Sequence, residues 1–285
     1  MKSGRAVLPS VLLFVLTACS RAGASPSPSA APSVAPTTAA SVSTGPSAEP
    51  VELTIYGAAS LKGPLEAAKA AYETTKPGAT VTLSTGSSAA LETQIEQGAP
   101  ADVFLSADTT NPKKLVDAGL ADGAAVTFAG NKLTVIVPTA NPADITSPKD
   151  LARSGVKFIA AGDEVPITKY ATQLVDSLAK EAGYRADFAA KYTANIASKE
   201  EDVKSVVAKI EIGEGDAGIV YVTDAKASTK VTTVDVPPSA NVPATYAGVV
   251  VKASKNAAAA KAFLDWFAGP DGQAILSSFG FLPSS

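Results

Sequence analysis

From Val51 onward, short strand patterns alternate with amphipathic helix patterns, and this alternation constrains the fold more than any other feature of the chain. Strands are predicted over 51–56, 80–84, 102–105, 133–137, 156–160, 217–221, 231–236 and 247–251. Helices are predicted over 60–75, 89–97, 111–118, 148–153, 170–182, 200–211, 257–268 and 271–279. Such alternation is typical of a mostly parallel α/β sheet, or of two of them. We therefore predict an α/β fold in which the segment from about 132 to 237 forms a lobe inserted into another.

The first nineteen residues lack this alternation and have the features of an export signal. A basic start precedes a mostly apolar stretch, 7–16, which is too short and too interrupted to span a membrane. The stretch ends in Leu-Thr-Ala-Cys, which resembles the bacterial lipobox, and Cys19 is the only cysteine of the chain. We expect residues 1–19 to be a lipoprotein signal peptide and Cys19 to be acylated, which would anchor the protein on the outer face of a membrane. The alternative is an ordinary signal peptide with an incidental cysteine.

Residues 20–50 consist almost entirely of Ala, Ser, Pro, Thr and Gly. A segment of this composition cannot offset the entropy of ordering by burying apolar surface. We interpret it as a partly extended linker that would give a tethered domain its reach, and an O-glycosylated stalk would serve the same purpose.

The ionisable residues exclude several classes of function. The chain has 0 His and 1 Cys, which rules out a His-containing catalytic triad, a His or Cys zinc site within one chain, and an internal disulfide. Residues 1–50 hold three of the 24 basic and one of the 27 acidic side chains, so the remainder has a net charge of -5 and no nucleic-acid surface is expected. Asp102 and Asp108 could form an acid–base pair, but no nucleophile or metal-ligand set accompanies them. A P-loop pattern is absent, so the chain supplies no ATPase.

Four predicted helix starts combine small residues, hydroxyls and a preceding turn, at 57–61, 85–89, 163–168 and 198–203. In open α/β sheets, ligands lie at the carboxyl ends of strands, where helices begin, and helix N-termini offer unpaired N–H donors to anions. Each feature also has a purely structural interpretation. Ser60 and Ser88 are typical of N-caps, Ser198 with Glu201 fits a capping box, and Tyr221 at a strand end is typical of half-buried packing.

Taken together and in this order, the four turns resemble those of the molybdate-binding proteins of bacterial ABC importers, within the type II periplasmic-binding-protein superfamily. The matching pieces are Ala58-Ala59-Ser60-Leu61, Gly86-Ser87-Ser88, the stretch from Gln94 to Asp108, Gly130-Asn131-Lys132-Leu133, Val165-Pro166, Glu201-Asp202-Val203 and Gly218-Ile219-Val220-Tyr221. The resemblance covers nearly all of residues 51–285. It implies a two-lobed fold with the ligand cleft between the lobes, one lobe made of 51–131 with 238–285 and the other of 132–237.

The resemblance also implies a binding site in which neutral donors from both lobes hold molybdate, or tungstate, without direct metal coordination and without a cofactor. The family's ligand-binding positions fall here on the side chains of Ser60, Ser88 and Tyr221 and on the backbone N–H groups of Ile167 and Val203. The chain departs from the family pattern after Val-Pro, where Ile167 and Thr168 replace a small residue and a glycine. A backbone donor survives such a change, so we expect pocket size and loop geometry to be affected more than binding itself.

Donors of this kind suit a tetrahedral dianion. Beyond residue 50 the only arginines are Arg153 and Arg185, and both lie outside the four turns, so affinity must come from short, oriented hydrogen bonds of ~1.5–3 kcal/mol each. A proton on the anion would lack an acceptor in such a site, so hydrogen phosphate should bind more weakly than sulfate, molybdate or tungstate.

The resulting hypothesis is an exported, lipid-anchored, monomeric binding protein that closes on its anion and delivers it to an ABC permease with separate ATPase subunits. It is not expected to be an enzyme. Three alternatives stay open: a binder of sulfate or another oxyanion, an enzyme on the same fold, and an adhesion or scaffold domain with a vestigial cleft.

Overall fold

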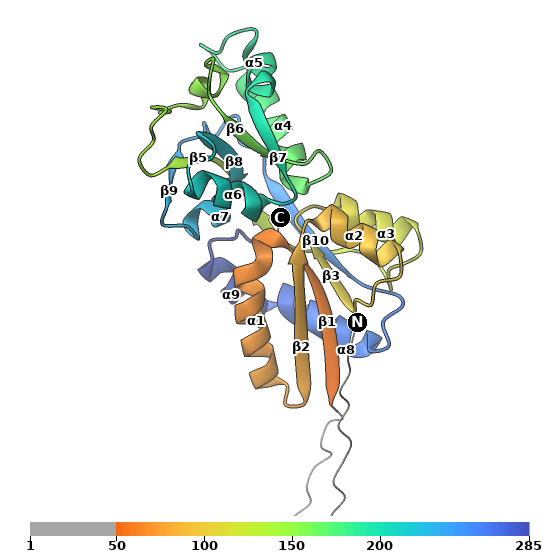
Figure 1. Cartoon of the computed structure of the whole chain (residues 1–285). Coiled ribbons are helices and arrows are strands. Elements are labelled where there is room, and N and C mark those ends of the chain that lie inside the picture. Colours follow the sequence, from red (N-terminus) through yellow and green to blue (C-terminus); the bar gives the residue numbers. More distant parts are fainter. Residues whose placement is uncertain (1–49, 285) are drawn as a thin grey trace, which may run out of the picture. The chain divides into compact units, whose positions relative to one another are not determined.

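The computed structural model describes residues 50–284, which form two five-stranded sheets covered by helices (Figure 1). The predictions for the signal peptide, for Cys19 and for the linker up to residue 49 lie outside the described residues. None of the helices within 50–284 is long and apolar enough to cross a membrane.

The first sheet has the strand order β2-β1-β3-β10-β4. Its strands are β1 (Val51–Ala58), β2 (Ala79–Gly86), β3 (Val103–Ser106), β4 (Val126–Asn131) and β10 (Ala244–Val250). Strand β1 runs parallel to β2 and β3, whereas β10 runs antiparallel to β3 and β4. The apolar side chains of β1 alternate as predicted, and Leu53 and Ile55 are fully buried.

The helices associated with this sheet are η1 (Ala59–Leu61), α1 (Lys62–Thr75), α2 (Ser88–Glu96), α3 (Thr110–Asp117), α8 (Ala257–Ala268) and α9 (Pro270–Ser278). Helix α1 buries one apolar stripe that includes Leu65, Ala68 and Tyr72, and Pro64 lies in its first turn, where no intrahelical N–H bond is lost. Tyr72 packs edge-to-face on Phe263 of α8, which ties the two helices together.

The second sheet has the strand order β7-β6-β8-β5-β9. Its strands are β5 (Leu133–Pro138), β6 (Phe158–Ala161), β7 (Ile196–Glu200), β8 (Ala217–Tyr221) and β9 (Val231–Val234). Its helices are η2 (Pro148–Ala152), α4 (Pro166–Leu178), α5 (Phe188–Ala194), α6 (Val203–Glu211) and α7 (Val222–Lys226). Strand β6 runs parallel to β7 and β8, and β5 runs antiparallel to β8 and β9.

The two sheets share one topology although the sequence shows no repeat. In each, three parallel strands are followed by a single antiparallel strand and then an edge strand. The chain passes from the first sheet to the second after β4 and returns before β10. The predicted two-lobed α/β architecture is therefore confirmed, but each sheet is mixed, with two parallel and two antiparallel strand pairings, where mostly parallel sheets were predicted. The helices after β1, β2, β6 and β7 all begin at carboxyl ends of strands.

The predicted capping box of Ser198 and Glu201 is wrong. Residues 196–200 form β7, an edge strand that sequence analysis missed, and the Ser198 hydroxyl donates to Glu200 Oε1 over 2.7 Å. Helix α6 begins later, and Asp202 is its N-cap, accepting from the N–H of Ser205 at 2.8 Å. Because a strand at the edge of a sheet can keep its charged side chains exposed, the sequence pattern of this strand resembled that of the polar first turn of a helix.

Other differences concern element boundaries and short elements. Helix α4 begins at Pro166, not Tyr170, because proline is well suited to the first helical position, where its missing N–H costs nothing. The predicted helix over 148–153 is a 3-10 helix. The short elements β4, α5 and α7 were not predicted.

Candidate functional site

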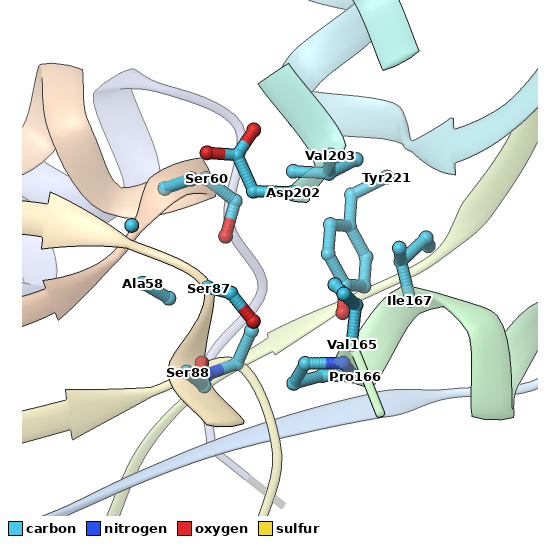
Figure 2. A pocket seen from close by; sticks show the side chains of 13 residues that line it. Ala58, Ser60, Ser87, Ser88, Val165, Pro166, Ile167, Asp202, Val203 and Tyr221 are labelled. Carbon is cyan, nitrogen blue, oxygen red and sulfur yellow. The ribbon is translucent and has the colours of Figure 1, made fainter. Parts of the chain in front are cut away.

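A pocket of about 210 Å³ lies where the helix starts of the two sheets face each other (Figure 2). Its lining consists of Ala58, Ala59, Ser60, Gly86, Ser87, Ser88, Ala107, Val165, Pro166, Ile167, Asp202, Val203 and Tyr221. All five residues that the sequence predicted as ligand contacts are among them. The structure thus brings together in one hollow residues that are up to 161 positions apart, from Ser60 to Tyr221.

Ser60 lies in η1, directly after β1, and is 4% exposed. Its hydroxyl does not cap a helix; its Oγ lies 3.0 Å from Oη of Tyr246 on β10. The N-cap interpretation of Ser60 is therefore not what the structure shows. Figure 2 shows the Ser60 hydroxyl directed into the pocket.

Ser88 is the first residue of α2 and is 1% exposed. Its Oγ accepts a hydrogen bond from the N–H of Ala107 at 3.0 Å, so it does not cap its own helix. Because a hydroxyl has one proton and two lone pairs, Ser88 keeps its proton for another acceptor.

Ser87, the residue before Ser88, was not singled out by sequence reasoning. It occupies the N-cap position of α2 without a capping bond, and its buried Oγ has no hydrogen-bond partner among the described residues. Figure 2 shows this hydroxyl facing the pocket. Two adjacent serines at one helix start were the available signal.

Ile167 and Val203 lie in the first turns of α4 and α6. First-turn N–H groups have no acceptor inside their own helix, which leaves them available to a ligand. The side chain of Ile167 is 2% exposed and also lines a separate hollow of about 600 Å³ beside α4 and α5. Thr168 does not line the pocket, and its hydroxyl donates to the carbonyl of Ala161 over 3.0 Å.

Tyr221 ends β8 and is 1% exposed. Burial raises the pKa of its hydroxyl well above the usual value, and the neighbouring Tyr246 and Tyr170 act in the same direction. The hydroxyl is therefore protonated at neutral pH, yet it has no hydrogen-bond partner among the described residues. An unpaired buried hydroxyl costs ~1–3 kcal/mol, and such groups in native proteins call for an explanation, a ligand being the simplest.

The electrostatics of the pocket are those of neutral donors. The residues that line it include no lysine or arginine, and Asp202 is its one carboxylate. That carboxylate caps α6 by accepting from Ser205, and Figure 2 shows it turned away from the serine hydroxyls. The walls therefore present hydroxyls and helix N-termini, which favour an anion without neutralising it by a salt bridge.

The described residues offer no metal centre, and Asp102 and Asp108 are not hydrogen-bonded to each other. No group of three or more His, Cys, Asp or Glu side chains gathers anywhere within 50–284. Asp102 and Asp108 lie at opposite ends of β3 and satisfy local groups. Asp102 accepts from the N–H of Thr54 at 2.7 Å, and Asp108 accepts from the N–H of Asn111 at 3.0 Å.

Comparison with known proteins adds sequence relatives to this geometry. Residues 53–282 match the family described as "Bacterial extracellular solute-binding protein". The molybdate-binding protein ModA of Mycobacterium tuberculosis is 32% identical over 238 residues, which span 83% of this chain and 87% of the relative. The putative ABC transporter substrate-binding lipoprotein YvgL of Bacillus subtilis is 33% identical over 82% of this chain and 88% of its own length.

Solved structures share the fold. The periplasmic molybdate-binding protein of Azotobacter vinelandii superposes with a TM-score of 0.69 at 27% identity, over 82% of this chain and all of that one. The sulfate-binding protein SubI of Mycobacterium tuberculosis reaches a TM-score of 0.72 at 23% identity, over 81% of this chain and 86% of that one. At that identity, the second comparison shows the fold alone.

Proposed function

The chain belongs to the bacterial extracellular solute-binding proteins, as a relative of the molybdate-binding proteins of ABC importers, and from this we propose that it captures molybdate, and also tungstate, in the pocket described above. We assign the binding contacts to Ser60, Ser88, Ile167, Val203 and Tyr221. The protein acts as a binding protein and carries out no catalysis.

The observation that carries this proposal is the buried, protonated and unpartnered hydroxyl of Tyr221 in the wall of the pocket. A donor that is buried without an acceptor is stabilised by a ligand that brings acceptors and no protons. A tetrahedral dianion does so, and each hydrogen bond to a charged group contributes ~1.5–3 kcal/mol. Five such bonds, less the cost of association, are enough for micromolar or tighter binding.

The proposed mechanism is closure of two lobes around the anion. We keep the lobe limits at 51–131 with 238–285 and at 132–237. Two contacts then come from one lobe and three from the other, so an anion that touches both sets favours the closed state. The closed protein is recognised by an ABC permease whose ATPase subunits are separate chains.

We further propose that the protein is exported as a monomer and held by a lipid on Cys19 at the outer face of the cell membrane. The Leu-Thr-Ala-Cys sequence supports this, as does the description of the Bacillus subtilis relative as a lipoprotein. A lipid anchor keeps the binding protein near the permease. Mass spectrometry of the membrane fraction tests it, because acylation would be lost in a Cys19→Ala variant.

Calorimetric titration of the purified protein with molybdate, tungstate, sulfate and hydrogen phosphate tests the proposed ligand. We expect molybdate and tungstate to bind with micromolar or lower Kd and the other two roughly a hundredfold more weakly. Preference for sulfate would leave the proposed closure of the two lobes intact and would make sulfate, not molybdate, the ligand. Absence of binding to all four anions would overturn the proposed function.

A further inference from the structure

A chain of buried hydrogen bonds runs behind the pocket from Ser60 to the segment where the polypeptide passes between the sheets. Ser60 Oγ lies 3.0 Å from Tyr246 Oη, and Asn131 Nδ2 lies 3.5 Å from the same oxygen. Asn131 Nδ2 also donates to Thr223 Oγ1 at 2.9 Å. Ser60, Asn131, Thr223 and Tyr246 are all at most 5% exposed.

The direction of these bonds follows from Asn131. Its Oδ1 accepts from the N–H of Lys132 at 2.9 Å, which fixes the orientation of the amide and leaves Nδ2 toward Tyr246 and Thr223. An amide nitrogen only donates, so Tyr246 Oη is the acceptor in its contact with Asn131.

Tyr246 must then use its own proton elsewhere. Its hydroxyl is fully buried, and burial raises its pKa well above the usual value, so the proton is present. Among the described residues, the remaining hydrogen-bond partner of Oη is Ser60 Oγ. If Ser60 donated instead, the Tyr246 proton would be buried with no acceptor within reach, which native proteins avoid.

We propose that Tyr246 and Asn131 are positioning residues that make Ser60 accept from behind, so that its own proton points into the pocket toward the anion. The inference rests on the proposed function. It adds a cause for the donor character of the site, because a Ser60 hydroxyl that accepts from Tyr246 keeps its own proton for the ligand. The Ser88 hydroxyl is oriented in the same way, because its Oγ accepts from the N–H of Ala107.

Isothermal titration of molybdate into a double-mutant cycle of Ser60→Ala and Tyr246→Phe tests this role. We expect Tyr246→Phe to weaken binding roughly three- to tenfold in the wild-type background and to change it less than about twofold when Ser60 is already Ala. Tyr72→Phe, which removes the hydroxyl of another buried tyrosine, in α1, should leave affinity unchanged. Equal losses from Tyr246→Phe in both backgrounds would overturn the inference.

Asn131→Asp provides a second cycle with Ser60→Ala that does not depend on the phenylalanine variant. A carboxylate accepts where the amide donated, so Tyr246 would turn its proton toward residue 131 and Ser60 would have to donate to Tyr246. We expect a loss of affinity that is smaller in the Ser60→Ala background, whereas simple charge repulsion would be the same in both. Failure of the wild-type protein to bind any oxyanion would reject the proposed function, while binding without coupling would reject the positioning role alone.

Discussion

The rings of Tyr221 and Tyr246 pack against each other with their centroids 5.6 Å apart, one from each sheet, yet their hydroxyls are in opposite situations. The hydroxyl of Tyr246 is hydrogen-bonded within the protein, and that of Tyr221 is buried without a partner. Contact with Tyr246 and with Tyr170, whose centroid lies 6.3 Å away, holds the Tyr221 ring in place before any ligand arrives. Pre-organisation of this kind lowers the cost of binding.

Removal of the Tyr221 hydroxyl should therefore change the stability of the free protein and its affinity for the anion in opposite directions. In Tyr221→Phe we expect the free energy of unfolding without ligand to rise by about 1 kcal/mol, because an unpaired buried hydroxyl is lost. Molybdate affinity should fall roughly ten- to hundredfold, because a hydrogen bond to a charged group is lost. Urea denaturation and calorimetry measure the two quantities.

The matched control for this variant is Tyr192→Phe. Tyr192 is also buried beside the second sheet, and burial raises its pKa, but it does not line the pocket. Its loss should leave affinity unchanged. Undiminished affinity in Tyr221→Phe would remove Tyr221 from the proposed contacts.

Ser88→Ala should reduce both stability and binding. The N–H of the buried Ala107 would lose its acceptor, at a cost of about 1–3 kcal/mol of unfolding free energy, and the anion would lose a donor. Ser254→Ala is the control, because the Ser254 hydroxyl also accepts a backbone N–H, from Asn256, at the opposite end of the first sheet. It should lower the unfolding free energy and leave molybdate affinity intact. Equal affinities in the two variants would contradict the assignment of Ser88.

Two substitutions at Asp202 separate the effect of its charge on anion binding from the effect of its helix cap on stability. Asp202→Asn keeps a side chain that caps α6 while removing the one carboxylate of the pocket wall, so molybdate should bind about two- to fivefold more tightly, and most clearly at low salt. Asp202→Ala loses the cap and should lower the unfolding free energy by about 0.5–2 kcal/mol. Weaker binding in Asp202→Asn at unchanged stability would mean that the carboxylate has a different role.

High pH should destabilise the fold through its buried tyrosines. Burial raises the pKa values of Tyr221 and Tyr246 well above the value near 10 of an exposed tyrosine. Unfolded tyrosines release protons near pH 10 while the folded ones retain theirs, so the stability present below pH 10 is lost as the pH rises above it. Denaturation midpoints from pH 8 to 11, with tyrosinate absorbance on the same samples, measure this. Full ionisation of all tyrosines near pH 10 without unfolding would contradict it.

Local patterns in the sequence predicted those helices and strands that bury apolar side chains along one face. The predicted helix over 257–268 has the bounds of α8, because its apolar residues repeat at helical spacing. Strand β7 was missed because an edge strand is held by backbone pairing with β6 and needs no apolar pattern. The family motif was sufficient to place the five predicted contacts in one pocket, although their roles remain proposals.

Tyr246, by contrast, could not have been found from local sequence. Its contact with Ser60 depends on β10 pairing between β3 and β4, and Ser60 and Tyr246 are 186 positions apart. Asn131 belongs to a piece that matched the family, but its part in orienting Ser60 depends on which way its amide faces, and a sequence does not specify that.

The departure from the family pattern at Ile167 gives the last prediction. The Ile167 side chain is almost fully buried and reaches the hollow beside α4 and α5, so it contributes packing, while its proposed contact to the anion is a backbone N–H. Ile167→Ala keeps that N–H in a helix that alanine favours and should lower the unfolding free energy by about 2–4 kcal/mol, with molybdate affinity changed by less than roughly threefold. Calorimetry below the unfolding transition separates the effect on stability from the effect on affinity. Val175→Ala is the control, because Val175 is a buried apolar residue of α4 that does not line the pocket. A large change in affinity in Ile167→Ala alone would mean that the isoleucine side chain, and not only its backbone, shapes the anion site.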